Sequence, residues 1–272
     1  MKVALTQMDI CWEDKITNYK KAEEFAKKAY EAGAEMLLFP EMSFTGFSMD
    51  TEKTAEVMQG ETVQRMYGLS RQYPGMVIGF GYAAFGGEHE DKARNCLELV
   101  CNGESVLHYE KLHPFSYGKE AEFFAGGNRI PVCKVSDIHI SGFICYDLRF
   151  PEVFQIASKK SELIFVIANW PKERELHWRV LLQARAIENQ AYVIGINRIG
   201  EGDGISYVPS SMGFDPYGNP LVGEFYSLEA SAEGFWLVDV EASVVTKLRN
   251  SFPLKSDRRE KYYAECYENE LF

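Results

Sequence analysis

The stretch Gly142-Phe-Ile-Cys145-Tyr-Asp-Leu-Arg-Phe-Pro-Glu152 decides how the rest of the chain is interpreted. Apolar residues lead into a single cysteine, and polar groups and a proline follow it. This order predicts a buried strand, a sharp turn and then a helix with Pro151 at its first position. At such a junction a thiol is placed to react, and the helix N-terminus is expected to help lower the pKa of Cys145. The alternative is that Cys145 is a small buried hydrophobic residue.

Composition and charge describe a globular chain whose partners are small molecules. The 272 residues are 46% hydrophobic and 25% charged, which is enough for a sizeable core, and the formal net charge is −11. An acidic surface disfavours nucleic acid and anionic membranes as partners. The N-terminus becomes polar too soon for a signal peptide, and no apolar run approaches the roughly 20 residues of a membrane helix. We therefore expect a cytoplasmic protein.

The cysteines and histidines are scattered along the chain. None of the six cysteines forms a Cys-x-x-Cys pair, and the histidines do not alternate with them at metal-ligand spacing. The sequence therefore predicts free thiols in a reducing compartment and no metal site.

Hydrophobic periodicity predicts a layered α/β fold in one domain, without repeats or linkers. A strand over 2–8, a helix over 16–31 and a buried apolar strand at 36–39 make a β-α-β opening. Asn102-Gly103 predicts a tight hairpin, because both positions of that turn need positive φ. The other predicted strands are 76–85, 93–100, 105–109, 131–135, 138–144, 163–168, 191–196, 211–215, 221–224 and 235–240, and the other predicted helices are 62–72, 151–159 and 173–189.

Three further segments are predicted to be turns, loops or a tail. Residues 111–129 have no clear period but are rich in glycine and aromatic residues, which is typical of a functional loop. Residues 200–204 are predicted to form a loop, and residues 216–220 the turn of a hairpin. The aromatic, charged tail 252–272 is expected to pack on a neighbouring subunit.

Three ionisable residues, Glu41, Lys111 and Cys145, each follow or end an apolar strand. Open α/β sheets place their sites at the carboxyl ends of strands, so the three could converge. A carboxylate can take a thiol proton and return it to a leaving amine, and a lysine can stabilise the oxyanion that a thiolate attack creates. The structural alternatives are a helix cap for Glu41, a solvated strand end for Lys111 and a core position for Cys145.

Three segments carry these residues: Phe39-Pro-Glu41-Met-Ser-Phe-Thr-Gly46, Tyr109-Glu-Lys111-Leu-His-Pro-Phe115 and the Cys145 stretch. Together, and in this order, they resemble the signature segments of the nitrilase superfamily of carbon–nitrogen hydrolases. The resemblance extends to about Pro253, and the segment 168–193 is most similar to the ω-amidase branch. It implies a four-layer αββα sandwich of two mixed β-sheets, one domain over residues 1–272, no cofactor, and a homodimer or higher homo-oligomer.

The resemblance also implies catalytic roles. Glu41 would act as general base and then as general acid. Cys145 would form a thioester acyl-enzyme and release ammonia before water completes the hydrolysis. Lys111 and the backbone N–H of Tyr146 would form the oxyanion hole.

A second active-site glutamate is implied in the loop that follows Lys111. In the family it precedes a glycine pair, here Gly126-Gly127, and Glu120 fits the spacing better than Glu122. The chain departs from the branch at Pro114, where a leucine is commoner. Because this loop borders the pocket, the departure leaves the substrate open.

The resemblance to ω-amidases implies a pocket for α-keto acid amides such as 2-oxoglutaramate and 2-oxosuccinamate. Such a pocket needs aromatic walls and a cation for a carboxylate. The candidates are Phe44, Trp170 and Tyr146 for the walls and Arg149, Arg174 and His177 for the carboxylate. Trp170 and His177 also have structural alternatives, in the core or in hydrogen bonding.

Other functions compete with the ω-amidase hypothesis. An N-carbamoyl-amine hydrolase would share the triad but have a different pocket. A non-catalytic member could bind a metabolite or a partner in the same cleft. A metal-dependent hydrolase is disfavoured, because no ligand cluster is found in the sequence.

Overall fold

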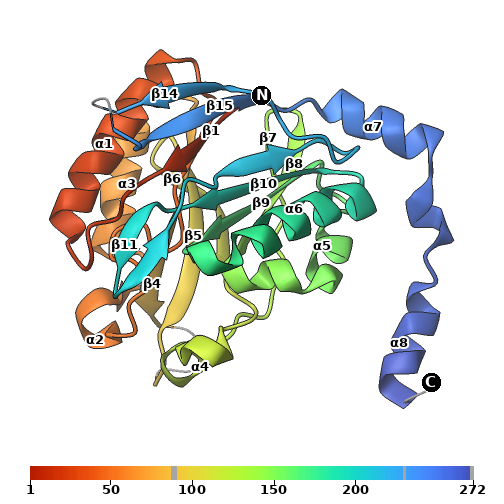
Figure 1. The fold of residues 1–272 in the computed structure, drawn as a ribbon, viewed down its shortest axis with the longest axis horizontal. Coiled ribbons are helices and arrows are strands. Elements are labelled where there is room, and N and C mark those ends of the chain that lie inside the picture. Colours follow the sequence, from red (N-terminus) through yellow and green to blue (C-terminus); the bar gives the residue numbers. More distant parts are fainter. Residues whose placement is uncertain (87–90, 229–230, 270–272) are drawn as a thin grey trace.

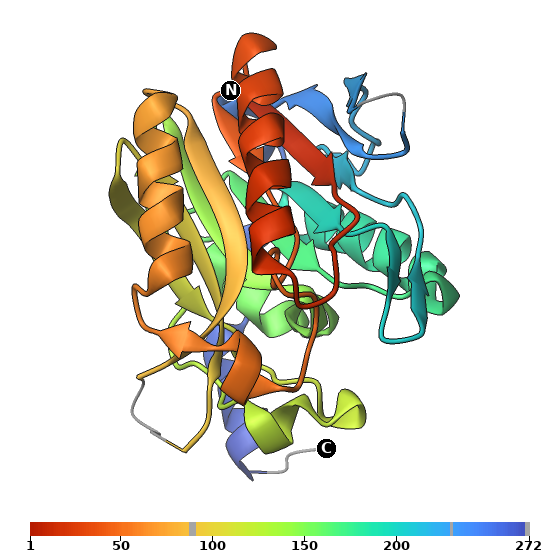
Figure 2. The same ribbon diagram turned by 90° about the vertical axis from the view of Figure 1, so that its left-hand side faces the viewer.

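The computed structural model describes residues 1–86, 91–228 and 231–269, which fold into a four-layer αββα sandwich (Figure 1). Two mixed β-sheets face each other, and helices cover the outer face of each. Figure 2 looks onto the pair that covers the first sheet. The predicted fold class is confirmed. The outer helices are α1 (Lys15–Glu31) and α3 (Glu61–Gln72) on the first sheet and α5 (Pro151–Ala157) and α6 (Glu175–Asn189) on the second.

The first sheet has the strand order β14-β15-β1-β2-β4-β5-β6, with β3 beside β4. Strands β1, β2 and β4 are parallel, whereas β5 is antiparallel to both β4 and β6. Strand β6 therefore runs in the same direction as β2 and ends at the same edge. The strands are β1 (Lys2–Gln7), β2 (Met36–Leu38), β3 (Glu56–Val57), β4 (Val77–Phe85), β5 (Arg94–Cys101), β6 (Glu104–Glu110), β14 (Glu224–Ser227) and β15 (Gly234–Asp239).

The second sheet has the strand order β13-β10-β9-β8-β7. Its central strands β8, β9 and β10 are parallel and almost entirely buried, and for β9 the continuous apolar run predicts this burial. A separate hairpin, β11 with β12, lies outside both sheets. The strands are β7 (Cys133–Val135), β8 (Ile138–Ile144), β9 (Leu163–Ala168), β10 (Tyr192–Asn197), β11 (Gly200–Gly202), β12 (Ile205–Tyr207) and β13 (Met212–Phe214).

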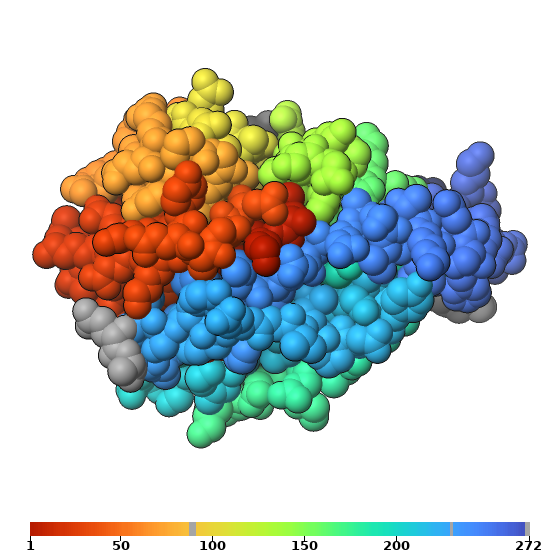
Figure 3. All heavy atoms as spheres, turned by 90° about the horizontal axis from the view of Figure 1, so that it is seen from above, coloured from red at the N-terminus to blue at the C-terminus, as the bar shows by residue number. Residues whose placement is uncertain are grey.

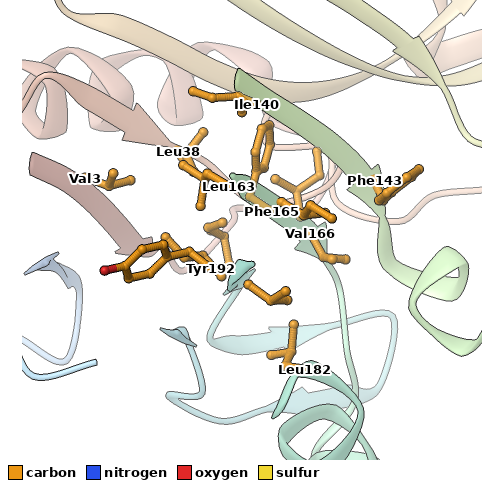
Figure 4. Close-up of a cluster of buried hydrophobic side chains, with 14 of the residues drawn as sticks. Val3, Leu38, Ile140, Phe143, Leu163, Phe165, Val166, Leu182 and Tyr192 are labelled. Carbon is orange, nitrogen blue, oxygen red and sulfur yellow. The ribbon is translucent and has the colours of Figure 1, made fainter. Parts of the chain in front are cut away.

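The core consists of two main clusters that the pleat of the first sheet separates. Val3 and Leu38 belong to the cluster that also includes Phe165 and other residues of the second sheet, part of which is shown in Figure 4. Their neighbours Ala4 and Leu37 belong to the cluster that the first sheet forms with α1 and α3. Successive side chains of a strand thus enter different layers, so both faces of the first sheet are apolar.

The predicted hairpin over 211–224 is confirmed only next to its turn, where Leu221 N–H donates to Gly213 O at 2.8 Å and Phe214 and Pro220 form an antiparallel bridge. The turn forms, since Asp215 N–H donates to Asn219 O at 2.9 Å. However, β13 pairs with β10 in the second sheet, whereas β14 begins only at Glu224 and pairs with β15 in the first sheet. The segment crosses from one sheet to the other, and local sequence carries no signal for that choice.

Several short elements also differ from the prediction. The predicted loop 200–204 is part of the β11–β12 hairpin, and the loop 111–129 contains the 3-10 helix η1 (Ser116–Gly118) and the short helix α4 (Glu120–Phe123). Helices α2 (Thr51–Thr54) and α7 (Ala242–Ser251) were not predicted. No helix in the described part of the chain is long and apolar enough to span a membrane.

The C-terminal segment leaves the sandwich as an arm (Figures 1 and 3). It contains η4 (Leu254–Asp257) and α8 (Glu260–Asn269), which has no buried residue. Its base is anchored where α5 and α6 end. Arg249 donates to Ser161 O at 2.9 Å and to Gln190 O at 3.1 Å, and Arg258 donates to Glu188 O at 3.0 Å. Cations are favourable at the C-terminal ends of helices.

Candidate active site

Three residues that follow different strands meet at one edge of the sandwich. Lys111 follows β6, Glu41 lies just beyond β2, and Lys111 Nζ donates to Glu41 Oε1 at 3.0 Å. Cys145 follows β8 of the facing sheet, close enough to Glu41 for a hydrogen bond that affects its pKa. Lys111 and Glu41 are 1% and 0% exposed. The structure thus brings together the three residues that the sequence predicts to converge.

Cys145 sits on a strained turn between strand and helix. Its φ is +45°, in the left-handed region that residues with a Cβ seldom occupy. It begins the 3-10 helix η2 (Cys145–Arg149), and α5 starts at Pro151, so the predicted helix start is confirmed. Because Tyr146 lies in the first turn of η2, its backbone N–H has no carbonyl acceptor within that helix. The turn therefore presents both the thiol and this N–H.

Asp147 holds this turn against the strand that carries Lys111. Its buried carboxylate accepts the backbone N–H of Ile144 at 3.1 Å and the hydroxyl of Tyr109 at 2.8 Å. It also accepts the backbone N–H of His113 at 3.1 Å, with His113 Nδ1 at 2.8 Å. The His113 ring stacks on Phe150, with ring centroids 3.8 Å apart. One carboxylate therefore connects the turn, the end of β6 and the loop after Lys111.

The Glu41 carboxylate is fixed from three sides. Its Oε1 accepts from Lys111 and, at 2.7 Å, from Asn95 Nδ2. Its Oε2 accepts the backbone N–H of Asn169 at 2.9 Å, and Asn169 Nδ2 donates to the Glu41 carbonyl at 2.7 Å. Gly81 permits this geometry, because a Cβ there would lie 2.4 Å from the backbone nitrogen of Met42 and 2.8 Å from the Cα of Glu41.

Glu120, and not Glu122, lies beside Lys111. Glu120 is fully buried and accepts from Lys111 Nζ at 2.8 and 3.1 Å through its two oxygens. It also accepts from Asn95 Nδ2 at 2.8 Å and from the backbone N–H of Phe115 at 2.6 Å. Glu122 is exposed. Glu120 begins α4, so the loop after Lys111 folds back onto Lys111.

The buried charges determine the protonation of the site. Burial alone lowers the pKa of Lys111, but Glu120 and Glu41 outweigh it and raise that pKa well above the usual range. Burial raises the pKa of Glu120, and Lys111 limits the rise. Burial also raises the pKa of the Cys145 thiol well above its usual value, and the charge of Glu41 adds to this effect. The resting nucleophile is therefore a neutral thiol.

The expectation that a helix N-terminus lowers the pKa of Cys145 is wrong. The helix that starts at Cys145 is a single 3-10 turn with a small dipole, and α5 begins only at Pro151. Burial raises the pKa of Cys145 most, the charges of Glu41 and Glu120 raise it further, and the charge of Lys111 only partly opposes them. Ionisation of the thiol therefore requires proton transfer to a neighbouring base.

A cavity of about 160 Å³ opens above the three residues. Arg149 and Arg174 line it, each beside an aromatic ring: the Arg149 guanidinium lies 4.9 Å from the Trp170 ring centroid, and that of Arg174 lies 5.7 Å from that of Phe115. Phe115, Tyr146 and Trp170 also line the cavity. The remaining lining residues are Trp12, Glu41, Phe47, Met49, Lys111, Gly118, Cys145, Asn169, Pro171, Gly202, Asp203, Ile205 and Tyr207.

Two predicted pocket residues do not line the cavity. Phe44 is 2% exposed and packs in the core against Tyr19, with ring centroids 4.8 Å apart, and against Phe80. The chain reverses after Glu41, where Met42 has a φ of +44°, and this reversal sends Phe44 toward α1. His177 is exposed on α6. Its Nδ1 lies 3.4 Å from Nη2 of Arg149, so it contacts a residue that lines the cavity but does not line the cavity itself.

Several residues at the site were missed in the sequence, and four of them are polar. Asn169 follows the apolar strand β9, so the strand-end rule that selects Glu41 also applies to it. Asn95 begins an antiparallel strand, and Asp203 and Tyr207 belong to the β11–β12 hairpin. No local pattern marks these three. Over the described ranges, no group of three or more His, Cys, Asp or Glu side chains is arranged to hold a metal ion.

The chain is similar to known proteins over nearly its whole length. The profile of the carbon–nitrogen hydrolase family matches residues 2–250. Omega-amidase YafV of Escherichia coli (strain K12) is 31% identical over 263 residues, which are 96% of this chain and 97% of that protein. The 2-oxoglutaramate amidase of Bacillus subtilis (strain 168) is 28% identical over 262 residues, 96% of this chain and 98% of that protein.

A solved structure extends this similarity to three dimensions. It is a mutant of the amidase from Nesterenkonia sp. AN1, with the acetamide moiety of fluoroacetamide covalently added at the active site cysteine. It is 25% identical, the match covers 97% of this chain and 96% of that chain, and the TM-score is 0.81.

Substitution of Glu41 by glutamine should separate turnover from thiol ionisation. We expect Glu41→Gln to lower kcat for amide hydrolysis at least about 100-fold, because the proton carrier is removed at nearly constant volume. The pH midpoint of Cys145 alkylation by iodoacetamide, followed by intact mass, should nevertheless move to lower pH, because Glu41 raises the pKa of this thiol. Turnover within a few fold of the parent would rule out Glu41 as the base. The exposed Glu122→Gln is the control and should change neither quantity.

Proposed function

Because the chain belongs to the carbon–nitrogen hydrolase family, we propose that it is an ω-amidase that hydrolyses the terminal amide of 2-oxoglutaramate or 2-oxosuccinamate. The chain is an amidase for non-peptide carbon–nitrogen bonds, with a small amide and water as reactants. The observation that supports the finer proposal best is the buried pair of Glu41 and Lys111, with the partly exposed Cys145, below a cavity that two arginines line. Two relatives named for this activity match nearly the whole chain.

Acylation begins with a proton transfer within the buried group. As Cys145 Sγ attacks the amide carbon, its proton passes to Glu41, which the raised pKa of the resting thiol makes necessary. Glu41 then donates this proton to the nitrogen of the tetrahedral intermediate. Ammonia leaves, and a thioester remains on Cys145. In the second half, Glu41 takes a proton from water as the water attacks the thioester, and then returns it to the departing thiolate.

Lys111 is placed to stabilise the oxyanion in both halves. Its ammonium has three N–H donors: one meets Glu41 Oε1, and one is shared by the two oxygens of Glu120 at 2.8 and 3.1 Å. The third remains for the substrate oxygen, together with the backbone N–H of Tyr146. A buried, fixed donor of this kind stabilises developing charge without reorganisation. Glu120 serves to hold Lys111 in this position.

The two arginines are proposed to bind the far end of the acyl chain. A keto-acid amide ends in a carboxylate, which a guanidinium can bind through two hydrogen bonds. Arg149 lies four residues beyond Cys145 and contacts Trp170, and Arg174 lines the same cavity beside Phe115. Aromatic rings on both sides fit the apolar chain between the carboxylate and the amide.

The C-terminal arm and the free thiols support a proposal for the oligomeric state of the protein and its compartment. We propose a cytoplasmic homodimer, in which α8 packs on the partner subunit. Tyr262, Tyr263 and Tyr267 of α8 are 44%, 45% and 77% exposed, although aromatic residues are enriched in interfaces. All six cysteines are unpaired, which fits a reducing compartment.

A substrate panel tests the proposed activity. We expect ammonia release from 2-oxoglutaramate and 2-oxosuccinamate but not from N-carbamoyl amines, and an acyl adduct on Cys145 by intact mass after acid quench. Cys145→Ala should give neither ammonia nor adduct. Turnover of carbamoyl substrates alone would favour the N-carbamoyl-amine hydrolase alternative. The absence of any adduct, with the parent and Cys145→Ala behaving alike, would favour a binding protein.

Arg149→Met should mainly weaken binding of the substrate carboxylate. Methionine keeps an apolar contact with Trp170 but lacks the guanidinium, so we expect KM for 2-oxoglutaramate to rise about 10- to 100-fold, the loss typical of a charge-assisted hydrogen bond. Hydrolysis of propionamide, which has no carboxylate, should change little. A similar loss for both amides would contradict a role in carboxylate recognition. Initial rates of ammonia release measure both substrates.

Substitution of exposed tyrosines on α8 tests the proposed interface. The combined change Tyr262→Ser and Tyr263→Ser should shift the molar mass measured by light scattering from dimer toward monomer, because it removes apolar area from the contact. Tyr217→Ser changes a similarly exposed tyrosine, 53% exposed on the turn after β13, and is the control. An unchanged mass for the double variant would place the contact elsewhere.

A further inference from the structure

Asn95 contacts both buried carboxylates of the site through a single nitrogen. Its Nδ2 donates to Glu41 Oε1 at 2.7 Å and to Glu120 Oε1 at 2.8 Å, and the side chain is 1% exposed. The residue lies at the start of β5, which runs antiparallel to β4 and β6. Its N-terminal end therefore lies at the edge where the charged residues meet. The Asn95 carbonyl also accepts the backbone N–H of Lys111 at 2.9 Å.

The hydrogen bonds of Glu41 distinguish its two oxygens. Oε1 accepts from Lys111 at 3.0 Å and from Asn95 at 2.7 Å, which uses its two lone-pair directions. Oε2 accepts the backbone N–H of Asn169 at 2.9 Å, and its next contact, with Asn169 Nδ2, is long at 3.4 Å. A further proton can therefore be accommodated on Oε2 but not on Oε1.

The amide of Asn95 supplies two donors without adding charge. Glu41 and Glu120 share the single ammonium of Lys111, so the buried group already carries two negative charges against one positive charge. Asn95 holds the two carboxylates together and leaves that balance unchanged. Its Oδ1 is buried without a hydrogen-bond partner among the described residues. An unpaired buried acceptor costs free energy, which the two hydrogen bonds from Nδ2 to charged carboxylates offset.

We propose that Asn95 is a positioning residue that occupies Glu41 Oε1 and so directs the catalytic proton to Oε2. The proposal rests on the acid–base role of Glu41 in the proposed function. In acylation, the S–H bond of Cys145 breaks, an O–H bond forms at Oε2, and the sulfur electron pair attacks the amide carbon. The proton then moves from Oε2 to the departing nitrogen. Lys111 and Asn95 stay bound to Oε1 throughout.

Asn95→Leu tests this role, because leucine is similar in size and has no donor. We expect kcat to fall about 10- to 100-fold, the range of a general-base contribution, while KM changes less than about threefold. The acidic limb of the kcat/KM profile should move to higher pH by about one unit, since a carboxylate that loses a donor holds its proton more tightly. Asn95→Ala also removes both donors and adds no charge or bulk, so the same shift is expected with it.

Asn189→Leu is the matched control. Asn189 is also fully buried and donates through Nδ2, at 2.9 Å, but to the backbone carbonyl of Arg185 on α6. Its replacement should lower Tm without moving the pH profile. If Asn95→Leu fails to fold, as judged by circular dichroism, Asn95→Ala provides the measurement.

The readouts separate failure of this inference from failure of the proposed function. Acyl-adduct formation on Cys145 of the parent, followed by intact mass, tests the proposed function alone. If the parent acylates and both Asn95 variants keep the parent's acidic limb, with kcat within about threefold, the positioning role is overturned. A loss of kcat with an unmoved acidic limb would also overturn it, because Asn95 would then act only on structure.

Discussion

The ammonium of Lys111, buried between the carboxylates of Glu41 and Glu120, is the interaction on which the site depends. All three groups are at most 1% exposed, so each has lost its hydration and relies on the others. Removal of one member of such a buried group typically costs about 3–5 kcal/mol, because an uncompensated charge remains. The three segments that carry these residues must therefore assemble cooperatively, because none of the buried charges is stable without the others.

The sandwich provides the rigid frame that this closure requires. Lys111 is tied to the start of β5 through its backbone N–H, and the turn after Glu41 is tied to β4 by the bond from Ser43 N–H to Gly81 O at 2.9 Å. Cys145 comes from the other sheet, so its distance from Glu41 is set by the packing between the two sheets. Leu38 and Phe165 belong to the core cluster that makes this contact. The apolar core thus sets the alignment of the reacting groups. Small errors in such alignment are costly, because catalysis depends on position.

Sequence reasoning succeeds where one local pattern determines the outcome and fails where distant segments choose their partners. The strands that lead to Glu41, Lys111 and Cys145 have local apolar runs or alternation, and Pro151 marks a helix start, so these elements were predictable. Asn95 was not, because it begins a strand and matters only through antiparallel pairing.

Other failures have the same physical origin. Phe44 was expected in the pocket because it lies near Glu41 in sequence, but the backbone reversal at Met42 turns it into the core. The pairing of β14 with β15 depends on a strand that follows it, and the turn at Asp215 favours a hairpin that tertiary pairing overrides. The protonation of Cys145 is a sum over burial and three charges, which no linear motif contains.

The neutral resting state of Cys145 has a consequence for the lifetime of the protein. Oxidants and soft metal ions react with thiolates far faster than with thiols, and overoxidation of cysteine is irreversible. A nucleophile that keeps its proton until an amide occupies the cavity is protected from peroxide during idle periods. Burial of the thiol and the charge of Glu41, which raise its pKa, therefore also lower its reactivity toward oxidants.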